Sequence, residues 1–126
     1  MVIIESSSAN LQERKRLNEE IERTFIFTAT AARNIQIYNQ TERGVSLIDL
    51  YERFFSEFSL LAILTSDLPQ MRNSKDAVEK ATKWIEDKPN LNSDEKMLAR
   101  LKDGFGVFMS YKKVLSEQGV ISLPSR

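Results

Sequence analysis

The sequence contains no cysteine and no histidine, and these two absences exclude several kinds of site. Without cysteine the chain has no disulfide and no thiolate nucleophile, and without either residue it has no Cys/His zinc site. Without histidine it also lacks the usual general base near neutral pH and the Ser-His-Asp triad. A cysteine-free chain is compatible with a reducing compartment, and we expect the protein to be cytoplasmic.

Glycine and proline are scarce, at 4 and 3 residues, which favours a few long elements over many short ones. The 126 residues suit a single domain, residues 1–126, that is large enough to bury a core without disulfides. Hydrophobic residues at 41% and charged residues at 29% are ordinary for a globular protein.

The chain also lacks a surplus of charge and a long apolar run. The chain has 18 basic residues, lysine plus arginine, and 18 acidic residues, aspartate plus glutamate. Because a protein that binds polyanions needs an excess of cations, we expect no nucleic-acid partner. The longest apolar run, "FFSEFSLLAIL" (54–64), is interrupted by Glu57 and is shorter than the ~20 residues of a membrane span. "MVIIE" at the start is too short and too acidic for a signal peptide. We therefore expect a soluble protein without a membrane partner.

Four blocks of apolar residues recur with the period of a helix, and turn-forming stretches at 42–46, 66–74 and 87–93 separate them. This pattern predicts an all-α antiparallel bundle of four helices, at about 10–40, 46–66, 75–88 and 93–118, with short apolar tails at both ends. Both termini would then lie at one end of the bundle, with residues 2–4 near residues 120–123 over the core.

The stretch "TFIFTATAARNIQIYN" (24–39) opens like a β-strand, with alternating aromatic residues. Good helix formers precede it without glycine or proline, and its apolar residues continue in steps of three and four. These features indicate one long helix of about 45 Å that overhangs the shorter helices. The residues on its main face are Leu17, Ile21, Phe25, Thr28, Ala32 and Ile35.

Helix boundaries are marked by capping residues. Ser46, with Asp49 three residues later, and Ser74 are predicted N-caps, and Asn92 or Ser93 caps the last helix. Gly119 followed by an apolar residue is typical of a Schellman ending. In "DGFG" (103–106) the two glycines favour close helix contact or a bend rather than a phosphate loop.

Two helices carry more apolar residues than one core-facing stripe requires. The first has a second stripe on its opposite side, and the second is apolar nearly all round in its last two turns. One interpretation is that one of these helices is central within the monomer. The other, which we adopt, is that a second stripe binds another copy of the chain in a two-fold homodimer, or a protein partner. The predicted interface residues are Ile26, Thr30, Arg33, Ile37, Leu60, Ile63 and Leu64.

The segment "NLQERKRLN" (10–18) has a basic cluster, Arg14, Lys15 and Arg16, of the kind with which basic helix-loop-helix proteins enter the major groove. Leu17 and the glutamates that follow it interrupt this pattern, and no second zipper-like helix follows at the expected distance. We therefore assign no family, and DNA contact through these three residues stays an alternative.

Two carboxylate pairs, Glu19 with Glu22 and Asp49 with Glu52, have the i,i+3 spacing with which all-helical nucleotide pyrophosphohydrolases hold magnesium. Acidic residues are numerous enough for such pairs to arise by chance, and helical geometry directs Glu22 and Glu52 outward. We predict no catalytic residue, no metal site and no cofactor.

These observations predict a non-enzymatic helical-bundle protein that acts through protein–protein interaction as a homodimer, in the role of an adaptor, regulator or accessory protein. A DNA-binding transcriptional regulator is the alternative, and a magnesium-dependent all-α nucleotide hydrolase is the third hypothesis.

Overall fold

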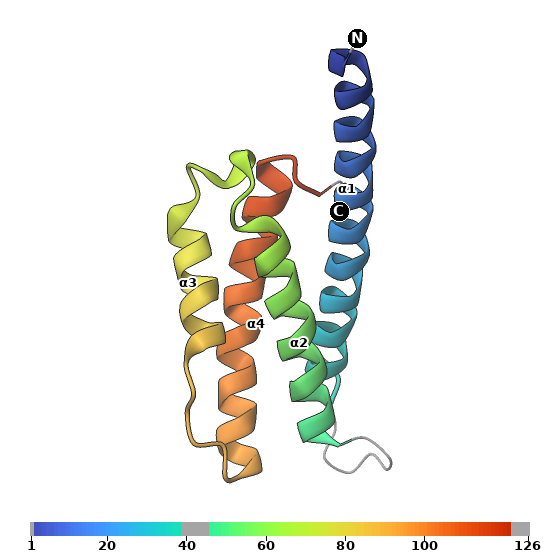
Figure 1. Cartoon of the computed structure of the whole chain (residues 1–126). Helices are drawn as coiled ribbons and strands as arrows, with labels where there is room; N and C mark the ends of the chain where they lie inside the picture. Colours follow the sequence, from blue (N-terminus) through green and yellow to red (C-terminus); the bar gives the residue numbers. More distant parts are fainter. Residues whose placement is uncertain (1, 39–45, 122–126) are drawn as a thin grey trace.

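The computed structural model describes residues 2–38 and 46–121, with side chains described from residue 11 onward. Its elements, in chain order, are α1 (Val2–Gln36), α2 (Leu47–Thr65), the short 3-10 helix η1 (Pro69–Met71), α3 (Lys75–Glu86) and α4 (Asp94–Glu117). The prediction of an all-α antiparallel four-helix architecture is confirmed (Figure 1). Within these described ranges, no helix has the combination of length and apolarity needed to cross a bilayer.

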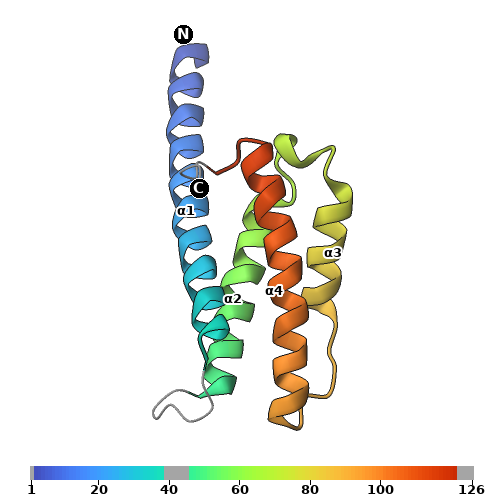
Figure 2. The ribbon, with the colours of Figure 1, turned by 180° about the vertical axis from the view of Figure 1, so that it is seen from behind.

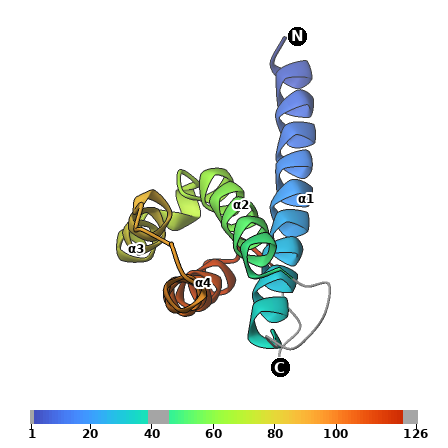
Figure 3. The ribbon, with the colours of Figure 1, turned by 90° about the horizontal axis from the view of Figure 1, so that it is seen from below.

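Helix α2 is the central element, because it contacts each of the other three helices. Helix α1 packs mainly on α2, and α3 packs mainly on α4. Figure 2, the view from behind, shows α4 beside α2 and α3. Figure 3, the view from below, shows that α2 separates α1 from α3. Helix α1 is thus an outer element, and much of its surface faces away from the other helices.

Helix α1 is longer than predicted, because it begins at Val2 rather than near residue 10. The predicted apolar tail at the N-terminus is wrong: these residues form the first turn of α1. The prediction that residues 2–4 lie beside residues 120–123 is also wrong for the described residues, because the start of α1 projects beyond the other helices while Val120 and Ile121 are buried (Figure 1). No glycine or proline interrupts this part of the sequence, so nothing ends the helix early.

Helix α1 ends at Gln36, four residues before the predicted end near residue 40. The boundaries of α2, α3 and α4 agree with the predicted ones to within two residues. Ser46 and Ser74 occupy N-cap positions without a side-chain capping bond, whereas the Ser93 hydroxyl accepts a hydrogen bond from the Lys96 amide at 3.2 Å. The predicted Schellman ending is present. Gly119 has a φ of 72°, and the amide of Val120 donates to the carbonyl of Leu115 at 2.9 Å.

The core is rich in aromatic side chains from α2, α3 and α4. Phe54 and Phe58 are fully buried and make edge-to-face contacts with Phe108 at centroid distances of 6.0 and 5.6 Å. Phe25 brings α1 into this cluster through a contact with Phe108 at 6.0 Å. Thr28 of α1 is fully buried, and its hydroxyl donates to the Thr24 carbonyl at 2.8 Å. The β-branched residues of this segment are therefore accommodated in a helix.

Candidate interaction surface

The outward side of α1 carries an exposed apolar stripe. Ile26 is 59% exposed and Ile37 is 66% exposed, whereas Thr28 is fully buried. Ile26 lies about 200° around the helix axis from Thr28, and Ile37 lies about 180° from it, so both isoleucines point away from the core. The Ile37 amide donates to the Arg33 carbonyl at 3.1 Å, so the helical path continues to this residue. We call Ile26, Thr30, Arg33 and Ile37 the α1 back stripe; Thr30 and Arg33 are also exposed.

The second stripe predicted on α2 is smaller than the sequence suggested. Ile63 is 72% exposed and Leu60 is 38% exposed, but Leu64 is half-buried and packs against the core. Leu64 lies on the same side of α2 as Leu60, about 80° from the buried Phe54, and α1 continues past this end of α2. Leu64 therefore packs at least partly within its own chain. The role of Leu60, Ile63 and Leu64 as an interface stays a prediction.

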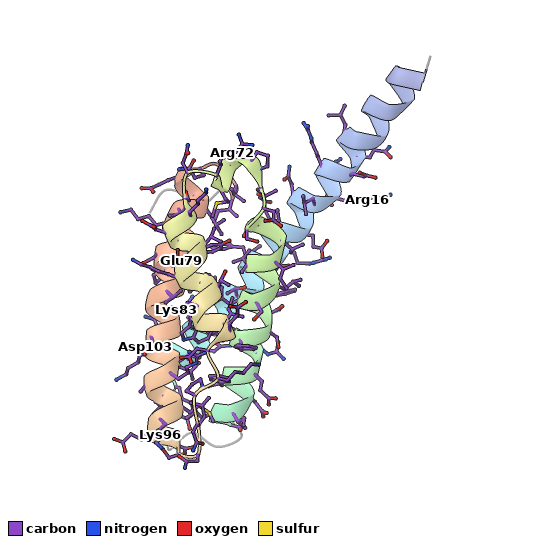
Figure 4. The ribbon with its side chains drawn as sticks, turned by 60° about the vertical axis from the view of Figure 1, so that its left-hand side comes forward. Arg16, Arg72, Glu79, Lys83, Lys96 and Asp103 are labelled. Carbon is purple, nitrogen blue, oxygen red and sulfur yellow. The ribbon has the colours of Figure 1, made fainter. Side chains whose placement is uncertain are left out.

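The basic cluster lies on the projecting part of α1. Arg14, Lys15 and Arg16 are exposed, and Figure 4 shows Arg16 beyond the body formed by the other helices. Glu13 and Glu19 on the same part of the helix are exposed as well. The projecting segment is therefore accessible, but it carries charges of both signs.

The two carboxylate pairs are not brought together. Asp49 and Glu52 lie in the first turns of α2, whereas Glu19 and Glu22 face the opposite end of α2, because α1 and α2 are antiparallel. Glu19, Glu22, Asp49 and Glu52 are exposed, and the α2 pair lines a shallow open depression that also contains Arg53. Among the residues that the structure describes, no group of three or more acidic side chains is placed to hold a metal ion.

An open groove between the end of α2 and the outer side of α3 was not predicted. Its volume is about 580 Å³, and both cations and anions line it, including Arg72, Glu79 and Lys83 (Figure 4). A smaller pocket of about 320 Å³ adjoins it and contains Ser59, whose buried hydroxyl has no hydrogen-bond partner among the described residues. The groove depends on the position of α3 relative to α2. The helical periodicity of each segment does not predict this position.

The buried Arg100 was also missed. Its guanidinium lies 4.3 Å from the centre of the Trp84 ring and donates to the carbonyl oxygens of Trp84 and Asp87 at the end of α3, the latter at 3.0 Å. Its Nε donates to the Tyr51 hydroxyl at 3.3 Å, and Nη1 lies 3.5 Å from the Asp87 carboxylate. Helix spacing places Arg100 on the inner face of α4, but an arginine is normally assigned to the surface. Because the guanidinium is fully engaged in joining α3 to α4 and α2, its role is structural.

A second buried polar contact joins α2 to α4. The Thr65 hydroxyl donates to the Leu61 carbonyl at 2.7 Å, so the Tyr111 hydroxyl is the donor in its own hydrogen bond to Thr65. Burial raises the pKa of Tyr111 above its ordinary value of 10.0, because desolvation disfavours the phenolate. Thr65 lowers this pKa only if its hydroxyl turns from the Leu61 carbonyl and donates to the phenolate. This contact is enclosed in the core and offers no surface to a ligand.

Comparisons of the chain with models of protein families, with curated proteins and with solved structures found no match.

Proposed function

We propose that the protein is a non-enzymatic helical-bundle protein that acts through protein–protein interaction and that it self-associates through the α1 back stripe. The observation that supports this proposal is the exposure of Ile26 and Ile37 on one side of α1, whose other side is packed against the body. Two large apolar side chains aligned on the outside of a helix favour burial against a partner. We propose a role as adaptor, regulator or accessory protein on this basis, and a cytoplasmic location stays a prediction from composition.

The strength of the association follows from the area that a partner would cover. Burying an isoleucine side chain completely contributes about 1.5–3 kcal/mol, so four isoleucines that are each about 60% exposed contribute roughly 4–7 kcal/mol across a two-fold interface. Association costs about 4 kcal/mol or more in lost translational and rotational freedom. The apolar contacts therefore exceed this cost by at most about 3 kcal/mol, which corresponds to a Kd of several millimolar. The dimer is weak and is populated mainly near millimolar protein concentration.

The test is a concentration series by sedimentation equilibrium, from about 10 µM to about 1 mM, so that the highest concentration approaches the millimolar Kd. We expect the average mass of the wild-type protein to rise across this series. The double variant Ile26→Glu with Ile37→Glu places charges on the interface, and we expect it to remain monomeric with an unchanged helical circular-dichroism spectrum.

Ile48→Glu is the matched control, because Ile48 is 52% exposed on α2. It lies seven residues from Phe55 and so shares the side of α2 on which Phe55 contacts Trp84 of α3, away from the α1 back stripe. This variant should self-associate like the wild type. A wild-type chain that stays monomeric at about 1 mM, or a double variant that associates normally, contradicts the proposal.

DNA binding is the second candidate, and the exposure of Arg14, Lys15 and Arg16 on the projecting part of α1 favours it. A helix that stands clear of its own body has the shape needed to enter a major groove. An electrophoretic mobility shift that weakens steeply with salt, and that disappears when the three residues are replaced by glutamine, is the expected result if this candidate is correct.

A further inference from the structure

We infer that two copies of the chain pair in an antiparallel orientation through the α1 back stripe, with Ile26 of one copy against the partner's Ile37. This inference rests on the proposed self-association and specifies its orientation and register. Both isoleucines are exposed on the same side of α1, and they are the apolar ends of the stripe.

The spacing of the α1 back stripe is the same in both directions. Its residues, at 26, 30, 33 and 37, follow one another at intervals of four, three and four. A two-fold interface uses the same surface on both subunits and therefore has to be complementary to itself. When a second copy runs in the opposite direction, each isoleucine meets an isoleucine, and Arg33 meets the partner's Thr30. The α1 back stripe is therefore complementary to the same stripe on a second copy, because both of its ends are isoleucines.

Charge favours the antiparallel orientation over the parallel one. In a parallel pair each residue lies beside its own copy, so Arg33 would face the partner's Arg33. Continuing the stripe towards the N-terminus, the exposed residues Arg23, Glu19 and Arg16 would each face a like charge as well. In the antiparallel pair Arg33 lies beside the partner's Thr30 hydroxyl, which accepts hydrogen bonds, and the two copies of Arg33 are offset by about 4.5 Å along the axis. The copies of Arg23, Glu19 and Arg16 are about 25 Å or more apart, because the projecting start of α1, seen for one copy in Figure 1, points in opposite directions in the two subunits.

The extent of the stripe also agrees with this pairing. Between Ile26 and Ile37 the stripe is about 16 Å long. Charged residues lie next to the stripe on its N-terminal side, and α1 ends at Gln36 on its C-terminal side. The exposed apolar residues therefore do not extend along this side of α1 beyond the four positions of the α1 back stripe. Thr30 is small and lies near the middle, where the two helix axes would come closest.

The experiment uses disulfide trapping, for which the chain is well suited because it contains no cysteine of its own. The variants Ile26→Cys and Ile37→Cys are prepared separately, one of them with a size tag, and are oxidised alone and as an equimolar mixture. A disulfide requires Cα atoms about 4.4–6.8 Å apart, whereas two copies of residue 26 in the antiparallel pair are about 16 Å apart. We expect the mixed 26–37 disulfide to exceed either symmetric disulfide by about tenfold or more.

Ile48→Cys, mixed with each variant, measures the yield from random collision, because Ile48 is exposed on another side of the molecule. Symmetric 26–26 and 37–37 disulfides as the main products indicate a parallel pair and overturn the inference while the proposed dimer stands. Yields at the Ile48→Cys level, together with a wild-type mass that rises with concentration, indicate a dimer through another surface and also overturn it. A wild-type mass that never rises contradicts the proposed function itself.

Discussion

The indole ring of Trp84 occupies the space in which residue 104 would carry a side chain. A Cβ atom placed on Gly104 would lie closer to Cζ2 of Trp84 than real Cβ contacts allow. The indole is held in this position, because its Nε1 donates to the Arg100 carbonyl at 3.2 Å and Phe54 contacts its ring at a centroid distance of 5.6 Å. Gly104 therefore sets the distance between α3 and α4, and any side chain at this position has to displace the ring.

The first prediction is that Gly104→Ala destabilises the protein. Alanine is the better helix former by about 1 kcal/mol, but overpacking a tight contact costs about 1–3 kcal/mol. Because the indole is held by a hydrogen bond and by aromatic neighbours, we expect the overlap to outweigh the propensity and to lower the free energy of unfolding by up to about 2 kcal/mol. Urea unfolding followed by circular dichroism measures this change.

Gly106 is the matched control in the same helix. It is exposed, and a Cβ atom at this position would meet nothing within 4 Å. Gly106→Ala should raise the free energy of unfolding by up to about 1 kcal/mol, because only the helix propensity changes. Equal effects of the two substitutions would show that Trp84 does not limit the packing at Gly104.

The second prediction concerns Arg100. Replacing it with methionine removes the donors to the carbonyl groups of Trp84 and Asp87, which lie at the end of α3. Hydrogen bonds to a charged group contribute about 1.5–3 kcal/mol each, and a long apolar side chain offsets part of this loss by filling the space. We expect the free energy of unfolding to fall by about 2–3 kcal/mol in urea unfolding.

Asp87→Asn separates the carbonyl contacts from the ion pair. The Asp87 side chain is 63% exposed, and its carboxylate lies 3.5 Å from Arg100 Nη1, so the pair contributes about 0–1 kcal/mol. The Asp87 carbonyl is kept in this variant. A loss from Asp87→Asn as large as that from Arg100→Met would assign the stabilisation to the ion pair instead.

The sequence predicted the helices well where the signals are local. Ser93 and Gly119 mark the ends of α4, and Pro89 follows α3, so these boundaries follow from capping and backbone chemistry. The start of α1 was missed, because no capping residue marks it and the sequence before residue 10 is not strongly periodic. The outward position of Ile26 and Ile37 could also be predicted, since it depends only on 3.6 residues per turn.

Features that depend on the placement of neighbouring helices could not be predicted in this way. Leu64 shares a side of α2 with the exposed Leu60, yet it is half-buried and packs against the core. Arg100 is buried because the end of α3 presents its carbonyl groups there, and the sequence of α4 gives no sign of them. The groove beside α3 is lined by residues of α3 and of the segment that follows α2, which come together only in the folded structure. Each case requires knowledge of an adjacent element, which periodicity within one element does not contain.

The third prediction concerns Tyr111 and alkaline pH. Burial raises the pKa of Tyr111 in the folded protein above the value of 10.0 that it has when unfolded. Between these two pKa values the unfolded chain has released the phenolic proton and the folded protein keeps it. The unfolded state then binds fewer protons, so the free energy of unfolding falls as the pH rises above about 10.

Tyr111→Phe tests this effect, because the variant cannot ionise at this position. At neutral pH it loses the hydrogen bond to Thr65 and should be less stable than the wild type by about 1 kcal/mol. Above pH 10 the wild type carries the extra ionisation penalty, so the difference should shrink and can reverse sign. Urea unfolding of both proteins from about pH 8 to pH 11 measures the difference and cancels the titration of the lysines that they share. A difference that stays constant over this range would mean that the Tyr111 hydroxyl titrates alike in the folded and unfolded states, and that its burial does not contribute to the pH dependence of stability.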